Sequence, residues 1–352
     1  MKIPQLGKKP EIKTCHNTTW EDNYSWIHQK NILEVLRDSS KLLPEVRDYL
    51  EKENDYTNFH LKDTKQIQKK IFDEIKGRIK LDDESLPFTD KKYEYWTKTT
   101  KKGNYSIKLR KKIGTNDIEE IWNGDLEKEK LKTEYFGVGD IEISYNDKLI
   151  AYSLDLKGSE YYKIYVKDIN TNKIIGEEIV DTSGSITFSL DDKYIFYSKL
   201  DKFHRPRKIF RHEIGKSIKD DKLIFEEKTE AFTVSIGLSS DEKYYFISSS
   251  DHNTSEQYFF NANDEDHKPK LIKKRKKGVL YSVNSWNNKF YLHTNENAED
   301  FKIDFCDDIT KQNWKPFVPA KNEVLIGGLV FLNDWIIRSE TSNALGKLII
   351  HD

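Results

Sequence analysis

A polar-then-hydrophobic pattern recurs along this chain at nearly even intervals. Each copy pairs a polar turn, containing Asp or Asn and usually Lys, with an aromatic or aliphatic run that is typical of a strand. The copies start 45 to 55 residues apart, at Thr89, Ser144, Ser189, Ser239, Ser285 and Phe331. A propeller blade of four strands takes about 40–50 residues. The pattern therefore predicts a β-propeller.

A second predicted strand follows the first in every repeat, after a polar connection. These second strands fall at residues 106–109, 163–166, 208–210, 257–260, 301–305 and 347–350. The residues from Asp168 to Lys173 have the composition of a hairpin turn. Residues 81–352 have room for about five to six blades at this spacing. We expect the sixth blade to contain only its inner half, because the chain ends after its second predicted strand.

Before the strands, residues 28–79 show the spacing of amphipathic helices. Pro44 suits a first helical position after two serines, and Val46, Tyr49 and Leu50 then share one face. A second helix carries an apolar stripe with polar residues opposite, made of Ile67, Ile71, Phe72, Ile75 and Ile79. The sequence thus predicts a helical N-terminal extension over residues 1–80 and a mainly β domain, a truncated propeller, over residues 81–352.

Composition limits the classes of partner. The 352 residues carry 59 Lys and Arg against 60 Asp and Glu, so no basic field favours nucleic acid or an anionic membrane. Aromatic residues make up 12% of the chain, which is too rich for a disordered protein. No apolar run is long enough for a signal peptide or a membrane span, so we expect a cytoplasmic protein. Cys15 and Cys306 are too few for a disulfide framework and too far apart for a C-x-x-C site.

The usual catalytic signatures are missing from these 352 residues. A nucleophile elbow needs G-x-S-x-G, and the nearest approach, Ser183-Gly184-Ser185, precedes a predicted strand rather than a helix. We interpret it as a turn before the strand at residues 186–188. The chain also has no phosphate-binding or dinucleotide-binding glycine loop and no H-E-x-x-H. The sequence therefore predicts no catalytic residue and no cofactor.

Three other groups of polar residues have ordinary structural interpretations. His204 and His212 lie in an Arg-rich stretch, where a solvated loop and strand face is favoured over a metal site. The basic run at residues 273–277 is interpreted as a solvated loop between strands. Paired acids are interpreted as solvated turn carboxylates, at residues 119–120, 191–192, 220–221 and 307–308. No metal-binding residue is predicted.

Several segments resemble the prolyl oligopeptidase family of serine peptidases, and within it the oligopeptidase B (protease II) branch. The resemblance rests first on residues 20–26 (WEDNYSW) and 44–56 (PEVRDYLEKENDY). It continues through residues 210–215, 221–227, 290–295 and 331–335, so it extends over nearly the whole chain. Between Trp26 and Pro44 this sequence is longer than the family pattern.

The resemblance implies a two-domain peptidase in which a seven-bladed propeller covers an α/β-hydrolase domain and restricts access to short peptides. Members of the oligopeptidase B branch cleave after Arg or Lys. The catalytic serine, aspartate and histidine of the family belong to the C-terminal hydrolase domain, which we expect to be absent from this chain. We therefore expect the chain alone to be inactive and its helices to pack on the hydrolase domain.

Several hypotheses about the chain stay open at this point. It is the product of a truncated gene, one half of a split enzyme, or a fragment of a longer chain. Its expected partner is then a separate polypeptide with the missing blades and the hydrolase domain, and short peptides bind once the enzyme is completed. A different hypothesis is a free-standing propeller that serves as a protein-binding scaffold, although an unclosed ring leaves strand edges exposed.

Overall fold

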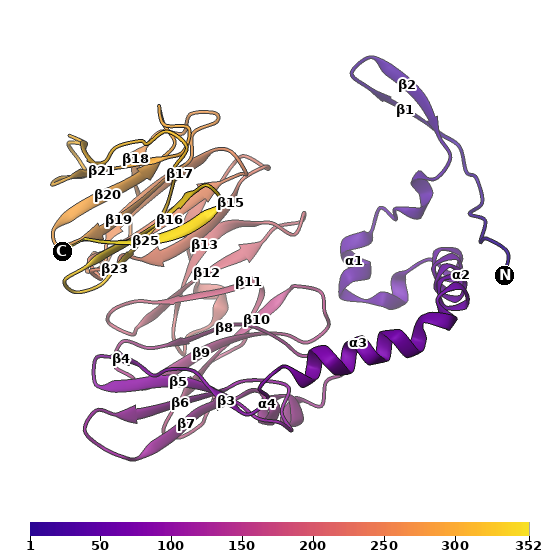
Figure 1. Ribbon diagram of the computed structural model, residues 1–352, viewed down its shortest axis with the longest axis horizontal. Coiled ribbons are helices and arrows are strands. Elements are labelled where there is room, and N and C mark those ends of the chain that lie inside the picture. The colour runs from indigo at the N-terminus through magenta and orange to yellow at the C-terminus, as the bar shows by residue number, and fades with distance from the viewer. Residues whose placement is uncertain (352) are drawn as a thin grey trace. The chain divides into compact units, whose positions relative to one another are not determined.

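The computed structural model describes residues 1–351 and divides the chain into two compact units. One unit contains Met1–Phe136 together with Lys157–Ser159, and the other contains Gly137–Leu156 together with the residues from Glu160 onward. Figure 1 shows helices and a first sheet in the N-terminal unit and a series of twisted sheets in the other.

The N-terminal unit begins with a hairpin that the sequence did not predict. Strands β1 (Glu11–Cys15) and β2 (Thr18–Asp22) pair antiparallel around a two-residue turn. His16 and Asn17 both adopt positive φ, 49° and 63°, as a tight turn of this kind requires. The strands are short and largely exposed, which is why hydrophobic alternation did not reveal them.

Helices follow the hairpin as predicted. They are α1 (Ile32–Arg37), α2 (Pro44–His60) and α3 (Lys65–Gly77), with single 3-10 turns at Ser25–Ile27, Ser39–Lys41 and Lys62–Thr64. Pro44 occupies the first turn of α2, where its missing N–H costs nothing, and Val46 is the buried residue of that helix. None of the helices within residues 1–351 combines the length and apolar character needed to cross a membrane.

The first sheet follows α3. It consists of β3 (Asp83–Glu84), β4 (Phe88–Asp90), β5 (Tyr93–Thr99), β6 (Ile107–Lys112) and β7 (Ile118–Asn123). Helix α4 (Gly124–Leu131) comes next, and the Asn123 side chain caps it by accepting from the Leu126 amide. Helices thus give way to strands between Gly77 and Asp83, while the compact unit itself extends to Phe136. The domain boundary at residue 80 stays a prediction.

The second unit is a succession of antiparallel sheets, which confirms the predicted propeller architecture. Its first seven strands are β8 (Gly137–Ile143), β9 (Leu149–Asp155), β10 (Tyr162–Asp168), β11 (Ile179–Phe188), β12 (Tyr194–Leu200), β13 (Pro206–Glu213) and β14 (Lys222–Glu226). The next two sheets are β15 (Thr233–Leu238), β16 (Tyr244–Ser250), β17 (Ser255–Asn261), β18 (Lys270–Lys273), and β19 (Tyr281–Trp286), β20 (Lys289–Thr294), β21 (Lys302–Cys306), β22 (Lys315–Val318). A 3-10 turn at Ile218–Asp220 precedes β14.

The expectation that the sixth blade contains only its inner half, ending after a second strand, is wrong. The last sheet has three strands, β23 (Leu325–Phe331), β24 (Ile336–Ser342) and β25 (Leu345–His351), instead of two. The reason is that the repeated polar phrase lies at the turn between the first and second strands of each blade, so one strand always precedes it. In β23 that strand contains two adjacent glycines, Gly327 and Gly328, which weaken its hydrophobic signal.

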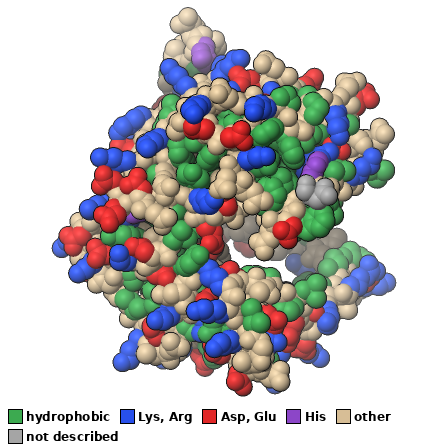
Figure 2. Space-filling model, turned by 90° about the vertical axis from the view of Figure 1, so that its left-hand side faces the viewer, with side chains coloured by type: hydrophobic (Ala, Val, Ile, Leu, Met, Phe, Trp, Pro, Cys, Tyr) green, Lys and Arg blue, Asp and Glu red, His purple; other side chains and the backbone are tan. Residues whose placement is uncertain are grey.

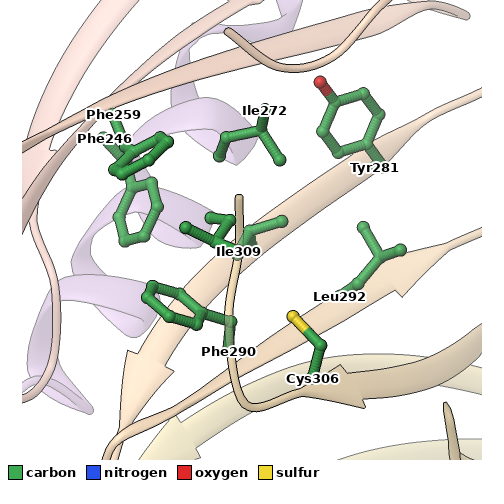
Figure 3. Close-up of a cluster of buried hydrophobic side chains, with 9 residues drawn as sticks. Phe246, Phe259, Ile272, Tyr281, Phe290, Leu292, Cys306 and Ile309 are labelled. Carbon is green, nitrogen blue, oxygen red and sulfur yellow. The ribbon is translucent and has the colours of Figure 1, made fainter. Parts of the chain in front are cut away.

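Hydrophobic cores fill the spaces between neighbouring sheets. In one of them, Phe246 and Phe259 of β16 and β17 meet Phe290 and Leu292 of β20, with Cys306 beside them (Figure 3). Each such side chain contributes about 1.5–3 kcal/mol by leaving water. Equivalent clusters join the other neighbouring blades of this unit, so each blade is stabilised mainly by the next one.

The repeated polar phrase is a turn closed by its own side chains, and one of its residues also bonds to the preceding blade. Ser189 Oγ accepts from the Tyr194 amide at 2.9 Å and donates to Asp191 Oδ1 at 2.7 Å. Asp192 follows with a φ of 57°, a conformation that Asp and Asn tolerate better than most residues. Its carboxylate accepts from the amides of Tyr145 and Asn146 in the preceding blade, the latter at 2.8 Å. The polar pattern in the sequence thus reflects an inter-blade link.

Candidate functional site

An exposed apolar face on α3 is the strongest candidate for an interaction site in the N-terminal unit. Ile67, Ile71, Phe72 and Ile75 lie on it at helical spacing, with exposed fractions of 49–62%. Ile79, just beyond the helix, is exposed to a similar degree. Scattered exposed hydrophobic residues are ordinary, but a contiguous stripe of large ones marks a surface that binds a partner.

The rest of α3 suits a surface helix. Lys69 forms an i,i+4 ion pair with Asp73 at 2.6 Å, and Arg78 pairs with Glu74. Such pairs stabilise an exposed helix by about 0.2–0.5 kcal/mol each. Helix α3 thus combines polar pairs with an apolar stripe that the described chain leaves exposed.

The Ser183-Gly184-Ser185 segment is neither a nucleophile elbow nor a turn. It lies inside the continuous strand β11, where the pairing register shifts between Thr182 and Ile186. Gly184 has a φ of 93°, and its carbonyl accepts from Ser153 Oγ at 2.7 Å. The predicted turn is therefore wrong: the glycine makes a β-bulge where β11 passes from one blade to the next.

The two histidines of the Arg-rich stretch lie in different environments. His204 sits in the β12–β13 loop, its ring 4.4 Å from the ring of Tyr161. His212 is buried on β13, and its Nδ1 lies 2.7 Å from Asp221 Oδ1. The interpretation as a solvated strand face is therefore wrong for His212. Among residues 1–351, no cluster of three or more His, Cys, Asp or Glu side chains is arranged to hold a metal ion.

Asp221 is likewise an exception among the paired acids. Its second oxygen accepts from the Tyr197 hydroxyl at 2.8 Å, so one carboxylate joins a histidine and a tyrosine inside the blade. Burial and this carboxylate raise the pKa of Tyr197 well above its usual range. Asp191 and Asp308 do cap turns, as predicted. Glu119 instead pairs with Arg110.

The basic run at residues 273–277 is only partly solvated, contrary to prediction. Arg275 inserts between two buried carboxylates, donating from Nη2 to Glu227 Oε2 at 2.6 Å and to Glu256 Oε2 at 2.7 Å. Its guanidinium also stacks over the Phe232 ring, 4.3 Å from the centroid. Lys273 and Lys276 pair with Glu296.

This buried network favours the charged form of Glu227. Burial alone would raise the pKa of Glu227, but hydrogen bonds from Ser249 Oγ, the Thr229 amide and Arg275 keep it below its ordinary value. Because these acceptors are satisfied by protein donors, the network is a structural brace within the sheets. The sequence carried no local signal for it, since Glu227, Glu256 and Arg275 are far apart along the chain.

Cys15 and Cys306 are both free thiols. Cys15 is exposed, whereas Cys306 is buried in the core of Figure 3, where loss of solvent raises the pKa of its thiol to about 11. A buried thiol of this kind is inert. Neither cysteine therefore adds a reactive group to the blades.

Comparison with known proteins identifies the family. The family model described as "Prolyl oligopeptidase, N-terminal beta-propeller domain" matches residues 4–352. "Protease 2" from Moraxella lacunata is 28% identical over 359 residues, which cover 100% of this chain and 50% of that protein. "Dipeptidyl aminopeptidase BI" from Pseudoxanthomonas mexicana is 27% identical, with 98% of this chain and 49% of that protein covered. The chain spans about half the length of these curated relatives.

Solved structures agree on the fold. Oligopeptidase B from Leishmania major superposes with a TM-score of 0.88 at 23% identity, covering 99% of this chain and 50% of that one. Oligopeptidase B from Trypanosoma brucei, with covalently bound antipain, gives 0.87 at 22% identity, covering 99% and 51%. The chain therefore belongs to the prolyl oligopeptidase family and corresponds to the N-terminal propeller portion of its oligopeptidase B-like members.

Proposed function

We propose that this chain is the propeller part of an oligopeptidase B-like serine peptidase that hydrolyses short peptides after Arg or Lys. The observation that carries the proposal is the family match over residues 4–352, together with relatives about twice as long. The 352 residues contain no G-x-S-x-G, and acyl transfer needs an activated nucleophile and oxyanion donors together. Catalysis in this proposal depends on an α/β-hydrolase domain, joined to this chain or supplied by a second polypeptide.

In this proposal the propeller limits access to short peptides, and the apolar face of α3 packs on the hydrolase domain. Covering a large exposed side chain such as Phe72 or Ile75 contributes about 1.5–3 kcal/mol. The stripe on α3 therefore supplies enough apolar surface for a stable contact, while its polar face stays in water.

A free-standing scaffold that binds proteins through its propeller is the alternative function. The exposed last strand, β25, speaks against it, because an open edge promotes association with other strands. The DNA that follows the codon for Asp352 distinguishes the two functions. A continuation that encodes further blades and G-x-S-x-G supports the peptidase.

We further propose that the protein works in the cytoplasm. Both cysteines are free, and Cys15 is exposed. An unpaired exposed thiol is typical of a reducing compartment. Localisation of a tagged chain by fractionation tests this part of the proposal.

The test of the peptidase proposal is reconstitution. The tagged chain is expressed alone and together with a polypeptide that carries an α/β-hydrolase domain of the family, and hydrolysis of Arg- and Lys-containing fluorogenic peptides is measured. We expect no turnover from the chain alone and turnover from the complex. A fluorophosphonate that labels a serine in this chain, with turnover, would overturn the proposal.

A pair of variants separates docking from nonspecific association. Phe72→Asp places a charge on the apolar face of α3 and should weaken capture of the hydrolase domain by at least about tenfold, because a buried unpaired charge is costly. Gln66→Asp, at an exposed position on the opposite face of the same helix, is the matched control. Equal capture by both variants would show that α3 is not the docking surface.

A further inference from the structure

One copy of the repeated turn departs from the others. The copies in blades two to five begin with Ser and carry Lys at the fifth position, at residues 144–148, 189–193, 239–243 and 285–289. In the β23–β24 turn, Phe331 stands at the serine position and Trp335 at the lysine position. This turn is closed by a backbone bond from the Leu332 amide to the Trp335 carbonyl, 2.9 Å. A local rule that is broken in one repeat often marks a functional site.

The departure creates a pocket between adjoining turns. A cavity of about 550 Å³ is lined by Ser240, Asp241, Trp286, Asn287, Phe331, Leu332, Asn333, Asp334 and Trp335. That size lies within the usual range for small-ligand pockets, about 300–1,000 Å³. The pocket therefore joins the turns of three successive blades, after β15, β19 and β23.

Aromatic side chains in the pocket are positioned before any ligand arrives. Trp286 Nε1 donates to the Leu332 carbonyl at 2.6 Å, which fixes the indole. Its ring lies 6.0 Å from the ring of Phe331. Trp335 and Leu332 each keep 47% of their surface exposed. Large aromatic surface thus remains available at the pocket mouth.

The charge of the pocket has one sign. The described residues that line it include two carboxylates, Asp241 and Asp334, and no Lys, Arg or His. Asp241 is held in place by the hydroxyls of Ser239 at 2.8 Å and Ser285 at 2.7 Å. Figure 2 shows basic and acidic side chains interspersed over the face it presents, whereas this lining is acidic only. A neutral apolar guest would desolvate the carboxylates without compensation.

We propose that this pocket binds the cationic side chain, Lys or Arg, of a peptide or protein segment. The indole and phenyl faces attract the cation and accept its aliphatic stem. The carboxylates add charge-assisted hydrogen bonds to its N–H groups. The site goes beyond the proposed peptidase function, because it needs no hydrolase domain.

The test uses the full chain and fluorescein-labelled hexalysine as the probe, at a protein concentration where sedimentation shows one species. We expect saturable binding that weakens with salt, and none of a labelled hexaglutamate peptide. Trp335→Lys restores the residue of the other repeats and should weaken binding by about tenfold or more, since it removes a cation–π partner and adds a like charge. Trp335→Phe keeps an aromatic face and should retain most of the affinity.

Charge is tested separately from the indole. Asp334→Asn should weaken hexalysine binding by about threefold to tenfold. Asp266→Asn removes a carboxylate with 73% exposure outside the pocket and should leave the affinity unchanged. Circular dichroism and the melting temperature verify that each variant folds. Binding that is absent in the wild-type chain, or equal across the Trp335 and Asp334 variants, overturns the proposal.

Discussion

Arg275 shows how one side chain can brace a propeller from inside. Its guanidinium joins Glu227, which follows β14, to Glu256 on β17, while Ser249 on β16 donates to the first of these carboxylates. Removing one partner of such a network leaves a buried charge with too few partners, which costs more than the intact contact contributes. The network therefore makes stability depend on the ionisation of Glu227.

The first prediction is that Glu227→Gln lowers the free energy of unfolding at pH 7 by about 1–3 kcal/mol. The pKa of Glu227 is held below its ordinary value, so its charged form is favoured in the folded state. Its contribution is complete above the unfolded pKa of about 4.3 and is lost as pH falls through the lower folded pKa. The difference in unfolding free energy between the wild type and the variant, measured by urea denaturation, should therefore become smaller as pH drops below about 4.3.

Glu230→Gln, at an exposed position nearby, is the control and should change neither the stability nor its pH dependence. If the difference in unfolding free energy between the wild type and Glu227→Gln stays constant from pH 7 to about pH 3, the effect does not come from ionisation of Glu227.

At the level of elements, the polar turns carry the contacts between blades. In blades four and five the link uses other atoms than in blades two and three: the Ser240 amide donates to Asn284 Oδ1 at 3.0 Å, and Ser285 Oγ donates to Asp241 Oδ2 at 2.7 Å. The position of the turn is thus constant, while the residue that bonds to the neighbouring blade changes.

We predict that Asp192→Gly destabilises the chain by about 1–2 kcal/mol although glycine suits the positive φ, because two amides of the preceding blade lose their acceptor. Glu242→Gly is the matched control, since Glu242 has the same turn position and a φ of 58°. Thermal unfolding of both variants gives the comparison. Equal losses of stability would show that backbone entropy explains the Asp192 effect, with no contribution from the inter-blade link.

Periodicity and turn chemistry were sufficient to predict the helices and the propeller. Pro44, the α3 stripe and the recurring turns are local signals, so a single sequence reveals them. The β1–β2 hairpin was missed because its residues are exposed and lack alternation. The Arg275 network was missed because Glu227 and Glu256 approach it only through tertiary packing. Pocket residues such as Trp335 carried a signal, the departure from the repeat, which shows only after the turns are aligned.

On the scale of the whole molecule, each blade depends on its neighbour for burial. In the third strands of earlier blades, Ile164, Ile209 and Ile303 are fully buried against adjoining sheets. In β25, the third strand of the last blade, Leu348 and Ile350 are exposed by 74% and 62%. Strand β25 pairs only with β24, so both its apolar face and its outer edge are open in the described chain.

The last prediction follows from that open blade. Unpaired strand groups beside aliphatic side chains favour edge-to-edge pairing, so the isolated chain should dimerise or aggregate as its concentration rises. The double variant Leu348→Lys and Ile350→Lys should shift sedimentation toward the monomer, because charged edge residues oppose strand addition. Leu86→Lys, at an exposed position outside the strands, is the control and should associate like wild type. A wild-type chain that sediments as a monomer at all concentrations would contradict the prediction, since β25 would then be an edge the protein protects by itself.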